Sequence, residues 1–98
     1  MYDSDPGWSF KETDAYIVLT RENHEVYLSL HALENEIPVR NRVYKCYRAL
    51  NGDVITLTYE NKILIDICVS YRGVIYQSWK INPATNLAMF EAKVFSNN

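Results

Sequence analysis

The chain has 98 residues, of which 48% are hydrophobic and 22% charged, and its formal net charge is −2. A chain of this length forms one domain that buries roughly 60 to 70% of the surface exposed in its unfolded form, and this composition excludes intrinsic disorder. We therefore expect a single domain over residues 1–98, with a mobile acidic tail at residues 1–7.

Charge is distributed unevenly along the chain. Residues 1–36 carry eight acidic and two basic side chains, a balance of −6, whereas residues 37–98 carry eight basic and four acidic side chains, a balance of +4. Such a dipolar domain can steer a charged partner, although the two parts can equally neutralise each other within one fold. The net charge of −2 by itself argues against affinity for bulk nucleic acid.

The sequence has features of a cytoplasmic protein that does not associate with membranes. No apolar run approaches the ~20 residues that cross a bilayer, and the first residues lack the apolar region of a secretory signal. Cys46 and Cys68 are the two cysteines, which we expect to be free thiols, with a disulfide as the alternative if their strands lie side by side.

The first third of the chain predicts strands. Trp8 and Phe10 are expected to anchor residues 8–12 on the body of the domain, where this segment can add a further strand. Residues 15–21 are rich in β-formers and predict the first long strand. Residues 25–34 alternate and favour one strand, whereas helix formers in 28–36 leave a short helix as the alternative. Residues 35–41, which contain a proline, are expected to be a loop.

The middle of the chain predicts a β-meander. Turn signals at Asn51-Gly52, Glu60-Asn61 and Arg72-Gly73 separate strands expected at residues 42–50, 54–59, 63–71 and 74–81. We expect Asn51-Gly52 to form a two-residue type I′ turn, because that turn needs positive φ at both central positions. Leu64 and Cys68 are expected on the solvent-facing side of the strand at residues 63–71. The opposite side is the clearest predicted core stripe, formed by Ile63, Ile65, Ile67, Val69 and Tyr71.

Residues 74–81 are expected to turn Ile75, Trp79 and Ile81 inward, and residues 87–95 predict the last strand. The predicted fold is therefore all-β. It is an antiparallel meander of about seven strands that forms a curled sheet or small barrel, with one short helix at most and a sandwich as the second choice.

Motifs for catalysis or for metal and cofactor binding are absent from the sequence. His24 and His31 lack the nucleophile motifs that accompany catalytic histidines. The spacings of cysteine and histidine match no zinc site, and each of the three glycines is explained by a turn. The fold could still bring two acidic residues together as a glycosidase-type catalytic pair, but the sequence singles out no such pair. We expect a non-enzymatic protein without a cofactor or metal.

A basic and aromatic segment at residues 40–48 is the most suggestive pattern. Bases interleaved with tyrosines are typical of single-stranded nucleic-acid binders, although a strand edge protected by charge explains them as well. Alternation places Arg42, Tyr44 and Arg48 on one side of a strand, and Lys45 and Tyr47 on the other. The predicted partner-binding residues are Tyr27, His31 and Leu33 on one strand face, together with Arg40, Arg42, Tyr44, Lys45, Tyr47 and Arg48.

We predict a protein-binding module that blocks or sequesters one partner, similar in size to inhibitors, toxin-immunity proteins and phage antagonists. The partner can be a nucleic-acid enzyme whose basic groove receives acidic residues. The alternative is a single-stranded nucleic-acid-binding barrel that uses residues 40–48. A small-molecule site lined by Trp79, Tyr59 and Tyr71 ranks last, because small barrels are filled by side chains. A homodimer through residues 87–95 is a further option.

Overall fold

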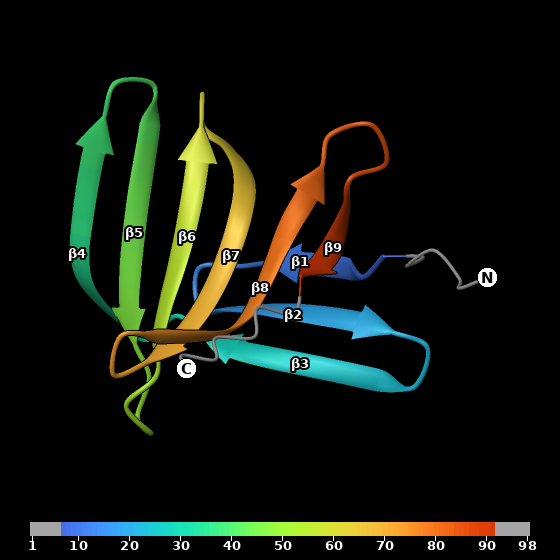
Figure 1. Cartoon of the computed structure of the whole chain (residues 1–98), viewed down its shortest axis with the longest axis horizontal. Helices are drawn as coiled ribbons and strands as arrows, with labels where there is room; N and C mark the ends of the chain where they lie inside the picture. The colour runs from blue at the N-terminus through green and yellow to red at the C-terminus, as the bar shows by residue number, and fades with distance from the viewer. Residues whose placement is uncertain (1–6, 92–98) are drawn as a thin grey trace, which may run out of the picture.

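The computed structural model describes residues 7–91, and these form nine antiparallel strands in two sheets without a helix (Figure 1). The predicted all-β meander is confirmed, with two strands more than expected. The tail predicted at residues 1–7 lies, apart from Gly7, outside the described residues. The smaller sheet has the order β1 (Ser9–Glu12), β2 (Tyr16–Arg21) and β3 (His24–Ser29). The larger sheet follows chain order: β4 (Ala32–Val39), β5 (Arg42–Arg48), β6 (Val54–Glu60), β7 (Ile63–Tyr71), β8 (Val74–Asn82) and β9 (Leu87–Glu91).

A backbone bridge between Trp8 and Ala88 joins the two sheets. The Trp8 N–H donates to the Ala88 carbonyl at 2.8 Å, and the Ala88 N–H donates to the Trp8 carbonyl at 2.8 Å. Trp8 and Phe10 also pack against the core, so the predicted anchoring is confirmed. In the described part of the chain, the strands thus form one ribbon whose two ends are β3 and β4, and the barrel does not close.

The hydrophobic core lies between the sheets, whose strands run across one another in Figure 1. Trp79 is fully buried, and its ring centroid lies 5.3 Å from that of Phe90 and 5.9 Å from that of Trp8. Side chains therefore fill the space between the two sheets. The other buried apolar residues are Ile17, Leu19, Leu28, Leu30, Ile55, Leu57, Leu64, Ile67, Val69, Ile81 and Ala88.

Two predicted elements between β3 and β5 are wrong. Residues 25–34 are not one strand, because β3 ends at Ser29 and the chain leaves the small sheet at Leu30 and His31. Residues 35–41 are not a loop, because residues up to Val39 belong to β4. Pro38 is tolerated there since β4 is an edge strand, where a missing N–H can face solvent.

The predicted core stripe of β7 is correct in its centre and wrong at its ends. Thr58 pairs with Asp66 and Tyr59 pairs with Leu64, so β7 carries one extra residue, Ile65, at this point. The extra residue reverses the alternation of side chains. Ile63 is therefore 66% exposed, and Leu64 is buried.

A second irregularity affects β8, where Val69 pairs with Gln77 and Ser70 pairs with Ile75. Tyr76 is the extra residue, so Ile75 takes the face opposite to that of buried Trp79, which corrects its predicted inward position. Tyr71, at the end of the predicted stripe, is exposed.

The turn at Asn51-Gly52 differs from the prediction. Residues 49–53 form a five-residue connection in which the Gly52 N–H donates to the Ala49 carbonyl at 3.0 Å. Gly52 has a φ of 96°, whereas Asn51 does not have positive φ, so the turn is not type I′. The turn after β6 does have positive φ at both residues, Asn61 and Lys62, as does Arg72-Gly73 after β7.

Neither Cys46 nor Cys68 forms a disulfide. Cys46 of β5 and Cys68 of β7 both pair with Thr56 of β6, which lies between them. Two strand spacings of about 4.8 Å separate them, which exceeds the Cα separation of up to about 7 Å that a disulfide spans. The fold therefore excludes the disulfide alternative.

Candidate partner-binding site

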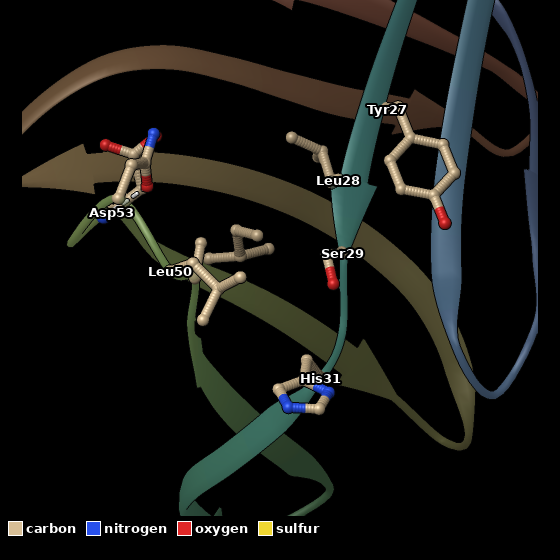
Figure 2. Close-up of a pocket in the computed structure, with 9 residues that line it drawn as sticks. Tyr27, Leu28, Ser29, His31, Leu50 and Asp53 are labelled. Atoms are coloured by element: carbon tan, nitrogen blue, oxygen red, sulfur yellow. Dashed lines mark hydrogen bonds between the residues drawn. The ribbon is translucent and has the colours of Figure 1, made fainter.

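An apolar pocket of about 420 Å³ lies between β3 and the connection from β5 to β6 (Figure 2). Buried Leu28 and Ile55 contribute to its lining, whereas Leu50 in the connection is 97% exposed. In Figure 2, Leu50 points across the hollow toward Ser29 and His31. The lining residues are Tyr27, Leu28, Ser29, His31, Ala49, Leu50, Asn51, Asp53 and Ile55.

Hydrogen bonds hold the connection that carries Leu50. The Asn51 side chain donates from Nδ2 to Asp53 Oδ2 at 2.9 Å and accepts the Asp53 N–H at Oδ1, also at 2.9 Å. Tyr76 of β8 donates its hydroxyl to Asp53 Oδ2 at 2.6 Å. Partial burial, with smaller contributions from this hydrogen bond and the Asp53 charge, raises the pKa of Tyr76 to about 12. The exposed Leu50 is thus presented on an ordered turn.

Ser29, His31 and Asp53 line one pocket, but their arrangement is not that of a catalytic triad. The Asp53 carboxylate is bound by Asn51 and Tyr76, and Figure 2 shows it across the hollow from His31, with Leu50 between them. Within residues 7–91, the Ser29 hydroxyl makes no hydrogen bond to His31. The pocket therefore offers an apolar surface with polar edges.

The structure divides the first group of predicted site residues. Tyr27 and His31 both line the pocket, and Tyr27 is 60% exposed with its ring stacked on Tyr16 at 5.0 Å between centroids. Leu33 lies on β4, where it pairs with Tyr47 of β5. The prediction of one shared strand face is wrong, because the chain passes from one sheet to the other between Ser29 and Ala32.

The basic segment at residues 40–48 is divided as its alternation predicts. Arg42 and Arg48 lie on the outer face of β5 with Tyr44, and each arginine contacts a carboxylate. Arg42 lies 3.2 Å from Glu60, and Arg48 lies 2.7 Å from Glu34. The hydrogen bond from Arg48 holds the pKa of Glu34 below its usual value.

Lys45 and Tyr47 lie on the inner face of β5, and Arg40 lies in the turn before it. The ammonium of Lys45 lies 5.3 Å from the ring centroid of Tyr59, and the Tyr59 hydroxyl donates to Glu12 of β1. Burial first, and then this hydrogen bond, raises the pKa of Tyr59. Burial likewise raises the pKa of Tyr47. The bases and tyrosines therefore do not form one continuous platform.

A second hollow of about 320 Å³ surrounds the Tyr59 and Glu12 pair. Negative carboxylates and positive ammonium groups both line it, so the hollow favours neither an anion nor a cation. Its lining residues are Glu12, Glu36, Val43, Lys45, Tyr59 and Lys62.

Sequence reasoning missed Leu50, Asn51 and Asp53 as site residues, because the Asn51-Gly52 pair indicates only a turn. The available signal was Leu50 itself, an apolar residue beside a predicted turn. Among the described residues, no group of three or more histidine, cysteine or acidic side chains could hold a metal ion. The described chain also contains no helix with the length and apolar character needed to span a membrane.

Comparisons with protein-family models, curated proteins and solved structures found no match to this chain. The pocket and its surroundings are therefore the structural features that can indicate a function.

Proposed function

We propose that this protein is a non-enzymatic binding module that blocks or sequesters one partner protein, in the manner of an inhibitor, immunity protein or phage antagonist. The observation that carries the proposal is the 97% exposed Leu50 held beside an apolar pocket. A single exposed leucine is ordinary. A rigidly presented leucine next to a pocket, with Tyr27 and His31 at the same site, supports protein recognition.

We also propose a cytoplasmic location, supported by Cys46 and Cys68 being reduced cysteines, outside any disulfide. A partner that is a nucleic-acid enzyme stays within this proposal. Homodimerisation through residues 87–95, of which 92–95 lie outside the described residues, stays a prediction with less support, because Trp8 occupies the edge of β9 at Ala88.

The test is affinity capture from native-cell lysate with the full-length chain and two variants, after nuclease treatment. Leu50→Asp places a charge at the pocket without disturbing the core. Val74→Asp is the matched control, because Val74 is exposed and does not line the pocket. We expect one protein that the wild type and Val74→Asp retain, and an affinity for Leu50→Asp that is at least about tenfold lower.

Reconstitution then decides whether the module blocks its partner. The purified partner should bind one copy of the chain by calorimetry and lose its own activity on binding. Equal retention by all three proteins, or a complex that leaves the partner's activity unchanged, would contradict the proposal.

The nucleic-acid alternative gives a different result. It predicts oligonucleotide binding that weakens steeply with salt and is lost in an Arg42→Glu/Arg48→Glu variant. Arg42 and Arg48 are each paired with a glutamate, so part of the positive charge that phosphate binding would require is already neutralised.

A further inference from the structure

The edge of β3 has backbone groups without a neighbouring strand in the described part of the chain. The Leu30 N–H donates to the Ala15 carbonyl at 2.9 Å, so this residue faces β2. Backbone direction alternates along an antiparallel strand. The N–H and C=O groups of Tyr27 and Ser29 therefore face away from β2, toward the free side of β3.

The apolar pocket lies along this same edge. Tyr27, Leu28 and Ser29 are consecutive residues of β3, and all three line the pocket. Successive side chains of a strand point to opposite faces of its sheet. A hollow that contacts all three must lie at the side of the strand, which agrees with the space between β3 and Leu50 in Figure 2.

The other end of the strand ribbon, β4, is protected against strand addition. Pro38 lacks an N–H, the register is interrupted between Leu33 and Asn35, and Glu36 places a charge on the inner face. Proline, bulges and inward charges are the means by which sheet edges avoid pairing. The register of β3 with β2 is continuous over all six residues of β3, none of which is proline.

We infer that β3 pairs with an extended segment of the partner protein, whose apolar side chain enters the pocket beside Leu50. This inference rests on the proposed function. Strand addition combines backbone hydrogen bonds with side-chain pockets that read alternate residues of the added segment. Basic residues should flank the apolar one, because the lining includes Asp53 and neither lysine nor arginine, and because Glu25 lies exposed on β3.

The probe is a library of synthetic decapeptides selected on the full-length chain. Ser29→Pro removes the outward N–H, whereas its matched control Ser29→Ala removes only the hydroxyl. We expect enriched peptides with an apolar residue between basic ones, and an affinity about tenfold weaker for Ser29→Pro than for Ser29→Ala, which keeps the backbone N–H.

Amide hydrogen exchange of the wild type provides a readout that does not depend on the folding of the proline variant. The amides of Tyr27 and Ser29 should exchange rapidly in the free protein and slow on peptide binding. Those of Leu28 and Leu30 should be protected in both states, since they face β2.

Peptides that bind without protecting the Tyr27 and Ser29 amides would overturn strand addition at β3. A homodimer that Ser29→Pro converts to a monomer would also overturn the inference, because a second copy of this chain would then pair with β3 in place of a partner segment. Failure of all peptides would overturn the inference too. Leu50-dependent capture of a folded partner would in that case still support the proposed function.

Discussion

Asp53 links the candidate site to the tyrosine of a distant strand. Its carboxylate accepts hydrogen bonds from Asn51 and from Tyr76, a residue 23 positions later in the chain. The position of Leu50 beside the pocket therefore depends on contacts made by its neighbours in the turn. Sequence reasoning found the turn but could not find this role, because nothing local marks Tyr76 as the partner of Asp53.

The raised pKa of Tyr76 predicts a loss of stability in alkaline solution. In the folded protein this pKa is about 12, above the usual value of 10, so folding favours the protonated form. The resulting stabilisation is complete below pH 10 and is lost as the pH rises toward 12. We expect the free energy of unfolding to decline more steeply over this interval for the wild type than for Tyr76→Phe.

Urea denaturation at a series of pH values measures this difference, and absorbance of the phenolate follows the ionisation directly. Tyr47 and Tyr59 also have raised pKa values, but they are present in both proteins and cancel in the comparison. Parallel stability curves for the wild type and Tyr76→Phe would contradict the assignment.

At the scale of the element, the strands follow from alternation, but their exact faces depend on bulges. Side chains of residues 54–60 alternate between the two faces of the sheet without an inserted residue, so Ile55 and Leu57 are buried as the alternation predicts. The inserted Ile65 shifts the phase within β7, and no local pattern announces it, because apolar residues occupy both phases there. A bulge arises from pairing with a neighbouring strand, which the sequence of one strand does not contain.

The turn between β6 and β7 offers a test of local backbone strain. Lys62 adopts a φ of 70°, a left-handed conformation that costs a non-glycine residue about 1–2 kcal/mol. Glycine avoids that cost but loses more entropy on folding. We expect Lys62→Gly to raise the free energy of unfolding by about 0.5–1 kcal/mol, as measured by urea denaturation.

Gly73→Ala, in the turn after β7, is the opposite change and should lower stability by about 1 kcal/mol. Gly73 has a φ of 83°, and a Cβ atom there would meet nothing within 4 Å, so conformation rather than crowding decides the result. A stabilising Gly73→Ala or a destabilising Lys62→Gly would show that backbone strain does not govern these turns.

At the scale of the whole molecule, Ala88 holds the two sheets together. It is fully buried and exchanges two backbone hydrogen bonds with Trp8. Ala88→Leu adds volume at this crowded contact, and overpacking costs about 1–3 kcal/mol. We expect that loss of stability together with faster amide exchange at Trp8 and at position 88. Ala84→Leu, in the exposed turn after β8, is the control.

If Ala88→Leu left amide exchange at Trp8 unchanged, the bridge would not be the contact that joins the sheets. The same experiment is informative about the pocket, because β3 reaches its position through the small sheet. Displacement of that sheet should weaken capture of the proposed partner, whereas Ala84→Leu should leave capture unchanged.

Sequence alone determined the all-β class, most strand positions, the buried centre of β7 and the anchoring role of Trp8, because alternation, turn residues and aromatic content act over short distances. The tertiary structure decided that β3 and β4 end the ribbon, that β6 separates Cys46 from Cys68, and that Leu50 lies beside β3. These features depend on which strands become neighbours. Strand order is set by burial of the whole core, which joins residues far apart in the chain.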